Sequence, residues 1–209
     1  MAEQTVTVFG PALELMKSVK SPEGEMLTKP FLDVCRNVLP VIDKFGSSMA
    51  LVKSDVGGNI SRLDAKYDSD PSANSLLYDI VRAEVAAKTA KGSSSCSNGM
   101  LWLTRAMDFL VELFRNLNDH SDWTMSQCAT AAYTSTLKKY HGWIASTAFT
   151  VAMKLVPERS KFYETLALGN STADMERFVT EFSPILAENH EFLVNIIGFS
   201  RFIFFYFVG

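Results

Sequence analysis

The stretch MLWLTRAMDFLVELFRNL, residues 100–117, decides the fold class of this 209-residue chain. Its apolar side chains recur three and four positions apart, which is the pattern of a helix that buries one side. The residues on this stripe are Met100, Leu103, Ala106, Met107, Leu110, Leu113, Phe114 and Leu117. At 1.5 Å per residue, about five turns extend for about 30 Å. The stretch therefore predicts one long helix.

Other segments show the same helical spacing. One stripe runs over residues 31–39, and residues 129–155 read as another long helix that stops near Pro157. Residues 171–175, STADM, read as the capped start of a further helix. The polar breaks between these segments are short, and none resembles a linker between domains. We expect an all-α fold of about eight helices.

The composition excludes several classes of protein. The formal net charge is −3 at pH 7 and no long basic tract occurs, so a nucleic-acid partner is disfavoured. Cys35, Cys96 and Cys128 form neither a CxxC motif nor a cluster with histidine at metal-ligand spacing. We therefore expect no metal site and no disulfide framework, but reduced thiols in the cytosol. Residues 1–10 have no basic residue before an apolar run, which disfavours a secretory signal.

The C-terminal segment is unusually apolar. Residues 192–208 are mostly hydrophobic and end in FIFFYF at 202–207, with Arg201 as an interruption. The segment is short for a bilayer span, which takes about 20 residues. We expect it to dock on the core or to lie on a membrane surface, and a tail anchor is the alternative. The chain 1–209 is expected to form one domain with an atypical hydrophobic tail at about 193–209.

A polar motif lies at residues 53–63, KSDVGGNISRL. Asp55, Asn59 and Arg62 are spaced i, i+4, i+7, so on a helix they share one face. That face offers a carboxylate acceptor, an amide that donates and accepts, and a guanidinium with several donors. The mixture suits a neutral polyhydroxyl group better than a phosphate. The alternative is a solvated helix face with no ligand.

The segment LWLTRA, residues 101–106, contains an indole in an apolar helix. Trp102 could stack on the flat apolar face of a sugar ring, although a tryptophan in such a helix is more often part of the core. Arg105 could pair with Asp108 or Glu112, or could anchor a neighbouring loop. The sequence leaves these alternatives open.

The segment LKKYHGW, residues 137–143, combines a histidine with lysines and two aromatic residues. His141 could hydrogen-bond an amide carbonyl or could be a buried histidine with a structural partner. The lysines, Tyr140 and Trp143 have the composition of a patch that contacts the membrane interface. The alternative is a charged helix face with two aromatic residues in the core.

A catalytic role is disfavoured. His120 and His190 lie among polar residues without an evident partner, and no GxSxG elbow occurs. No pairing of cysteine with histidine is supported by the sequence. We expect that the protein is not an enzyme and that it uses no cofactor.

Taken together, the three motifs resemble the glycolipid transfer protein family. The resemblance extends from about Phe31 to Phe192 and includes three motifs in the same order. It implies a two-layer helical sandwich that encloses an apolar tunnel for the lipid chains, with the headgroup at the tunnel mouth. It also implies a cytosolic protein that contacts membranes peripherally and transiently, and that transfers its lipid without chemistry. We expect the chain to act as a monomer.

The resemblance also implies roles for individual residues. Asp55 matches the aspartate that binds the ceramide amide N–H, and His141 matches the histidine that meets the ceramide carbonyl. Asn59 and Trp102 match the residues that contact and stack on the sugar. Arg62 falls where many members have a lysine, a change that keeps the charge but alters the donor geometry.

The membrane-docking residues follow from the same resemblance. Trp143 matches the docking tryptophan of the family, and Tyr133 and Lys138 are expected to be its neighbours on that surface.

The headgroup is expected to be an uncharged sugar. In a sister branch that binds ceramide-1-phosphate, the positions of Asn59 and Trp102 are basic and a further arginine occurs at Asn98. All three are neutral here, so a phosphate would lose charge-assisted hydrogen bonds. We expect a glycosphingolipid ligand, with monohexosylceramides first. The alternatives are a ceramide-1-phosphate transfer protein, or a glycosphingolipid sensor that acts through a protein partner.

Overall fold

The computed structural model describes residues 7–46, 49–166 and 172–198, and the described part contains nine α-helices. In chain order they are α1 (Gly10–Met16), α2 (Thr28–Asp43), α3 (Ala50–Ser69), α4 (Leu77–Ala86), α5 (Cys96–Asp119), α6 (Met125–Ser135), the 3-10 helix η2 (Lys138–Tyr140), α7 (Trp143–Ala152), α8 (Arg159–Thr165) and α9 (Ala173–Ile197). The all-α prediction is confirmed.

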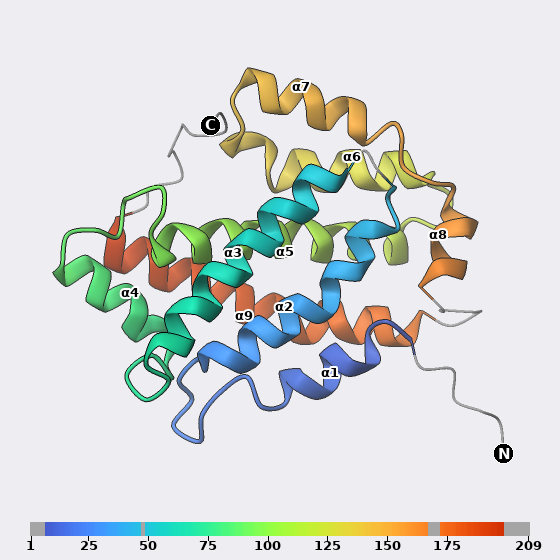
Figure 1. The fold of residues 1–209 in the computed structure, drawn as a ribbon. Coiled ribbons are helices and arrows are strands. Elements are labelled where there is room, and N and C mark those ends of the chain that lie inside the picture. The colour runs from blue at the N-terminus through green and yellow to red at the C-terminus, as the bar shows by residue number, and fades with distance from the viewer. Residues whose placement is uncertain (1–6, 47–48, 167–171, 199–209) are drawn as a thin grey trace, which may run out of the picture.

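The helices form two layers (Figure 1). In the first layer α2 packs between α1 and α3, and in the second α5 packs between α6 and α9. The layers meet where α3 crosses α5 and where α1 contacts α9. Helix α4 packs against α5 and α9 at one end of the molecule. The predicted two-layer helical sandwich is therefore confirmed.

Phenylalanine rings join the two layers in the core. Phe9, just before α1, lies 5.0 Å from Phe114 of α5 and 5.3 Å from Phe178 of α9, measured between ring centroids. Phe182, one turn beyond Phe178, contacts Phe31 of α2. Edge-to-face and tilted contacts of this kind add to the free energy gained by burying the rings. These ring contacts join the segment before α1 to α2, α5 and α9.

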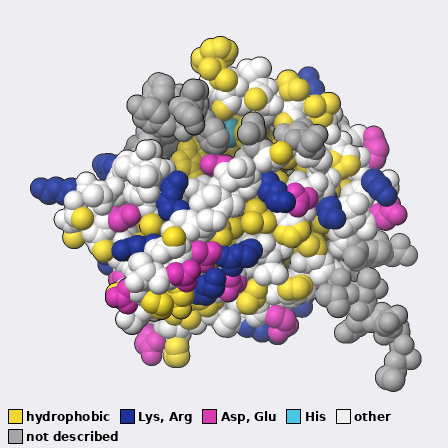
Figure 2. Space-filling view, in the orientation of Figure 1, with side chains coloured by type: hydrophobic (Ala, Val, Ile, Leu, Met, Phe, Trp, Pro, Cys, Tyr) yellow, Lys and Arg dark blue, Asp and Glu magenta, His cyan; other side chains and the backbone are white. Residues whose placement is uncertain are grey.

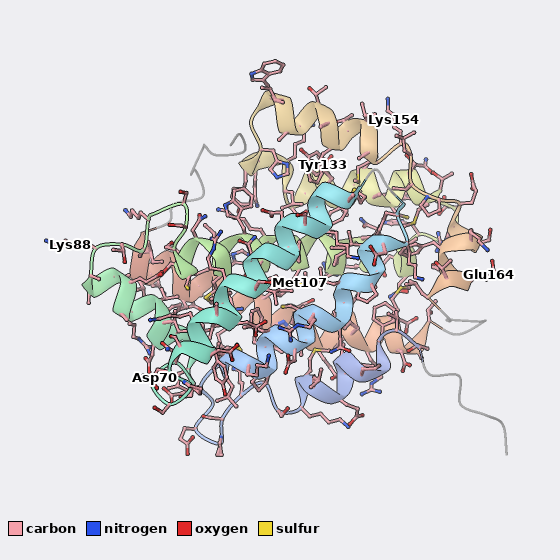
Figure 3. The ribbon with its side chains drawn as sticks, viewed as in Figure 1. Asp70, Lys88, Met107, Tyr133, Lys154 and Glu164 are labelled. Atoms are coloured by element: carbon pink, nitrogen blue, oxygen red, sulfur yellow. The ribbon has the colours of Figure 1, made fainter. Side chains whose placement is uncertain are left out.

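Helix α5 agrees with its predicted stripe but is buried on more than one side. Met107 and Leu110 on the stripe are buried, and so are Thr104 and Arg105 beside it. The reason is position, because α3, α6 and α9 all pack against α5. Figure 3 shows Met107 at the middle of the molecule.

The prediction of one long helix over residues 129–155 is wrong, because the structure has two α-helices and a 3-10 helix there. Helix α6 ends at Ser135, and the Thr136 hydroxyl donates to the carbonyl of Ala132 in its last turn. The 3-10 helix η2 follows, and then His141 with an extended backbone (ψ 131°) and Gly142 turn the chain into α7. The break directs the side chain of His141 between helices, as described below. It also accounts for nine helices in the described part instead of about eight.

Helix α9 begins where the sequence predicted a helix start. Its first residue is Ala173, and the hydroxyl of Thr172 donates to Glu176 and does not cap the backbone. The helix continues through Ile197, so residues 193–197 of the expected hydrophobic tail are helical. Residues 199–209, including the aromatic run, lie outside the described part. Within that part, no helix combines the length and the apolar character that a membrane span requires.

The N-terminus of α5 is held by a carboxylate from α4. Glu84 accepts hydrogen bonds from the backbone N–H groups of Cys96 and Ser97, both at 2.8 Å, and from the Ser97 hydroxyl at 2.6 Å. Ser95 adds a side-chain cap by accepting from the N–H of Asn98 at 3.0 Å. An anion at this end also interacts favourably with the helix dipole. Together these contacts fix the end of α5 that carries Trp102.

We expect the Glu84→Ala substitution to lower the free energy of unfolding by about 2–3 kcal/mol, because it removes charge-assisted hydrogen bonds and leaves two helix N–H groups unpaired. Urea denaturation followed by circular dichroism measures the change. Glu14→Ala is the control, because Glu14 forms only an exposed ion pair with Lys17. Equal stability of the two variants would contradict this account of the cap.

The three cysteines have the state expected from the sequence. Cys35, Cys96 and Cys128 are free and buried.

Candidate functional site

A small apolar cavity lies between α3, α5, α7 and the segment that connects α6 to α7. Its volume is about 230 Å³. Its apolar walls come from Val52, Ala106, Leu137, Ile144, Ala145, Ala148 and Phe149. Three further lining residues carry polar groups. They are Asp55 with a carboxylate, Trp102 with an indole N–H and His141 with an imidazole. The structure thus brings together three of the predicted lipid-binding residues, each from a different element: Asp55 and Trp102, which were expected at the headgroup, and His141, which was expected at the ceramide amide.

Asp55 is a partly buried carboxylate beside the apolar walls. It lies one turn before Asn59 on α3, and Asn59 Nδ2 donates to Asp55 Oδ2 at 3.4 Å. Burial raises the pKa of the Asp55 carboxyl, while the positive charge of Arg62 acts in the opposite direction. An incompletely satisfied carboxylate at the edge of an apolar cavity is suited to accept a hydrogen bond from a ligand N–H.

Asn59 and Arg62 lie one and two turns further along the same face of α3. Asn59 is buried, and the Nη1 of Arg62 donates to the carbonyls of Ser93 and Ser95 at 3.3 and 3.2 Å. Arg62 thereby anchors the loop that leads into α5. Neither residue lines the cavity itself, and their predicted contacts with a sugar stay predictions.

The rings of His141 and Trp102 stack on each other at the cavity. Their ring centroids are 6.0 Å apart with 26° between the planes. Burial, followed by the positive charge of Arg105, lowers the pKa of His141 to about 4. The imidazole is therefore neutral at physiological pH, and a hydrogen bond at 3.1 Å joins its Nδ1 to the hydroxyl of Tyr133. With the hydroxyl donating to Nδ1, the ring carries its proton on Nε2 and can offer it to a carbonyl.

The expectation that Tyr133 lies on the membrane-docking surface is wrong. Tyr133 is 2% exposed and packs against Phe149 of α7, with 5.1 Å between ring centroids. Figure 3 shows it beneath α7. Its hydroxyl orients His141, so its place is behind the cavity. Tyr133 continues the buried spacing of Cys128, Ala129 and Ala132, a signal that the sequence already contained.

The other two residues expected on that surface are exposed. Trp143 is 80% exposed at the start of α7, and Lys138 is exposed one turn earlier. Ile144, Val151 and Leu155 are also exposed along or just after α7. Figure 2 shows hydrophobic side chains projecting over α7 and a hollow below them in which a histidine is visible. The apolar exposed edge of α7 and the cavity are therefore adjacent.

The sequence interpretation did not identify the cavity residues of α7. Ile144, Ala145, Ala148 and Phe149 all line the cavity. Their spacing of i, i+1, i+4, i+5 places them on one helix face, a signal that was available. It was missed because residues 129–155 were interpreted as one continuous helix.

The comparisons with known proteins agree with this arrangement. Residues 26–168 match the family described as Glycolipid transfer protein (GLTP). The chain is 60% identical over 191 residues to Glycolipid transfer protein 1 of Arabidopsis thaliana, which covers 91% of this chain and 95% of that protein.

Two solved structures have the same fold. A structure addressing how FAPP2 selects simple glycosphingolipids with the GLTP-fold has a TM-score of 0.81 at 26% identity, over 93% of this chain and 98% of that one. A mutant of Arabidopsis ACD11 in complex with C12 ceramide-1-phosphate has a TM-score of 0.83 at 18% identity, over 92% and 96%. Both similarities extend over nearly the whole chain. Together with the family match and the Arabidopsis relative, they confirm the resemblance inferred from the three motifs: the chain belongs to the glycolipid transfer protein family.

Proposed function

We propose that this protein transfers glycosphingolipids between membranes without altering them, and that monohexosylceramides are its preferred cargo. One observation carries the proposal. Asp55, Trp102 and His141, from different elements, meet at the edge of an apolar cavity. A carboxylate and a neutral imidazole match the N–H and C=O of a ceramide amide, and an indole matches the apolar face of a sugar. The 60% identity to an Arabidopsis glycolipid transfer protein supports the same function.

The lipid chains require more space than the cavity holds. Its volume of about 230 Å³ is below the roughly 300–1,000 Å³ of pockets that hold drug-sized ligands. Chain entry therefore requires the cavity between α3, α5 and α7 to widen. Burying chain methylenes yields about 0.8 kcal/mol each relative to water, but the lipid leaves an equally apolar bilayer. Chain burial thus permits transport, and selectivity comes from the polar groups.

The polar groups favour a sugar over a phosphate. Among the residues expected to read the headgroup, Arg62 carries the one permanent positive charge, and its Nη1 already donates to two backbone carbonyls. Asp55 adds a negative charge that would repel a phosphate. The fold itself does not discriminate, because chains of nearly equal structural similarity include one crystallised with ceramide-1-phosphate.

Transfer between vesicles tests the proposal. Glucosyl-, galactosyl-, lactosyl- and phosphoryl-ceramide are compared side by side with purified protein. We expect the monohexosyl forms to move fastest and the phosphoryl form to move at the uncatalysed rate. Faster phosphoryl transfer would assign the ceramide-1-phosphate alternative. Tight binding without transfer would assign the sensor alternative, and a changed lipid on thin-layer chromatography would show an enzyme.

The proposed site of action is the cytosolic face of membranes, which the protein contacts peripherally and transiently as a monomer. The buried, free thiols of Cys35, Cys96 and Cys128 are compatible with a reducing compartment. Trp143 is exposed and supplies an indole that can insert at the depth of the lipid headgroups. Lys138 is exposed and supplies a positive charge that attracts anionic lipids.

We expect Trp143→Ala to lower the affinity for phosphatidylcholine vesicles by about 10- to 100-fold, because about 1.5–3 kcal/mol of apolar burial in the interface is lost. Vesicle co-sedimentation measures the affinity. Binding of a short-chain glucosylceramide in solution is the control and should not change, because the Trp143 ring points to solvent. Unchanged vesicle binding would remove Trp143 from the docking surface.

A further inference from the structure

Arg105 of α5 is a buried cation that forms no salt bridge with a carboxylate of the described residues, although the charge of Asp108 one turn along the helix acts on it. It is 3% exposed, its Nε and Nη1 have no hydrogen-bond partner, and no ion pair joins it to an acidic residue in the described ranges. Burial lowers the pKa of the Arg105 guanidinium, yet arginine stays protonated in proteins. A buried charge with unpaired donors opposes folding unless something else compensates it.

Two aromatic rings contribute to that compensation, together with the negative charge of Asp108 on the same helix. The guanidinium carbon of Arg105 lies 3.5 Å from the ring centroid of Tyr140 and 4.9 Å from that of Trp102. Such cation–π contacts are strongest when the cation is desolvated. Trp102 precedes Arg105 by one turn on α5, whereas Tyr140 comes from η2. Arg105 therefore links two elements through their rings.

Both linked elements supply residues to the cavity. Trp102 lines the cavity directly, and Tyr140 is followed by His141, which also lines it. Arg105 does not line that cavity but faces a separate cleft of about 730 Å³, together with Asp108 and His190. It thus contacts Trp102 and the residue before His141 without lining the cavity itself.

We propose that Arg105 is a positioning residue for headgroup recognition, which clamps Trp102 and Tyr140 so that the indole and the His141 imidazole keep a fixed spacing. The inference rests on the proposed function and extends it. The same clamp ties the site to the docking segment, because Tyr140 lies between the exposed Lys139 and the turn that leads to Trp143. Arg105 touches no lipid in this role.

Substitution of Arg105 by methionine and by lysine tests the clamp. We expect Arg105→Met to lower glucosylceramide transfer about tenfold. Arg105→Lys should fall between it and the wild type, because an ammonium keeps the charge but cannot stack flat on two rings. Arg115→Met is the matched control, since Arg115 is on the same helix and lines the same cleft but pairs with Glu112 and Ser183. It should change transfer less than twofold.

Two readouts separate positioning from a loss of stability. In a background with Trp123→Phe and Trp143→Phe, the emission of Trp102 reports ligand binding, and the change on adding a short-chain glucosylceramide should largely disappear with Arg105→Met. A double-mutant cycle provides the second readout. Adding Arg105→Met to Trp102→Ala should lower transfer by clearly less than the tenfold expected for Arg105→Met alone, because the indole is already gone and only the contact with Tyr140 remains to be lost.

The possible failures are distinguishable. A wild-type protein that moves no glycolipid would refute the proposed function. A wild type that transfers, combined with unchanged transfer and unchanged Trp102 emission in a folded Arg105→Met, would overturn the clamp alone. Fully additive losses in the cycle would also overturn it. If Arg105→Met does not fold, as judged by circular dichroism, the emission of Trp102 in Arg105→Lys decides, and a response equal to the wild type overturns the clamp.

Discussion

The Asp55→Val variant is expected to transfer glucosylceramide about 100-fold more slowly than the wild type. The substitution removes the acceptor proposed for the ceramide N–H, which then enters the site without a partner. A lost hydrogen bond to a charged group together with an unpaired buried donor corresponds to about 2–3 kcal/mol, or about two orders of magnitude in affinity. Intervesicle transfer of a fluorescent glucosylceramide measures the effect.

The fold should survive changes at Asp55, because the carboxylate does not stabilise it at neutral pH. Burial raises the pKa of Asp55, so the folded protein binds a proton more readily than the unfolded chain. Stability linked to this group is therefore greatest below the usual aspartate pKa and is lost as the pH rises through the raised pKa. Asp55→Asn should unfold at a higher urea concentration than the wild type at pH 7, and the difference should shrink toward pH 4.

Asp68→Asn is the matched control for Asp55, because Asp68 is exposed near the other end of α3. It should change neither transfer nor its dependence on the headgroup. Transfer by Asp55→Val at the wild-type rate would refute the assignment of Asp55. A loss of stability in Asp55→Asn at pH 7 would refute the explanation of the carboxyl pKa.

The spacing of apolar residues predicts those helices that carry a single continuous apolar stripe. Helix α5 was found because its apolar residues keep one period from Met100 to Leu117. The sequence does not reveal the break between α6 and α7, because apolar residues continue on both sides of it and the turn involves contacts of His141 with Tyr133 and Phe149. Gly142 was the one local sign of a turn, and a single glycine is a weak signal.

Local spacing also predicts one part of the site, the polar face of α3. The spacing of Asp55, Asn59 and Arg62 gave the shared face of α3 from local geometry. That α7 would complete the cavity, or that Arg62 would hold the loop before α5, depends on contacts between residues more than 30 positions apart along the chain. Spacing within one helix does not contain that information. Arg105 shows the limit most clearly, because its acidic neighbours on α5 suggested an ion pair and its actual partners are rings.

Trp102→Ala is expected to lower glucosylceramide transfer about 10- to 30-fold through loss of the sugar-stacking surface. A buried aromatic face contributes its apolar area and an additional 0.5–1.5 kcal/mol, approximately, from ring geometry. The effect should depend on the headgroup. Binding of ceramide, which has no sugar, should change less than threefold, whereas loss of Asp55 should weaken both lipids because both contain the amide. Isothermal titration calorimetry with short-chain lipids measures the affinities for ceramide and for glucosylceramide, and this readout does not depend on tryptophan emission.

Two control variants make the test of Trp102 specific. Trp102→Phe keeps an aromatic face and should retain most of the transfer. Trp123→Ala removes an indole that stacks on His120, with 3.7 Å between ring centroids, and that does not line the cavity. It should transfer glucosylceramide like the wild type. If Trp102→Ala weakened ceramide and glucosylceramide by the same factor, Trp102 would support the shape of the cavity without reading the sugar. Selectivity would then have to come from Asn59 and Arg62 on α3.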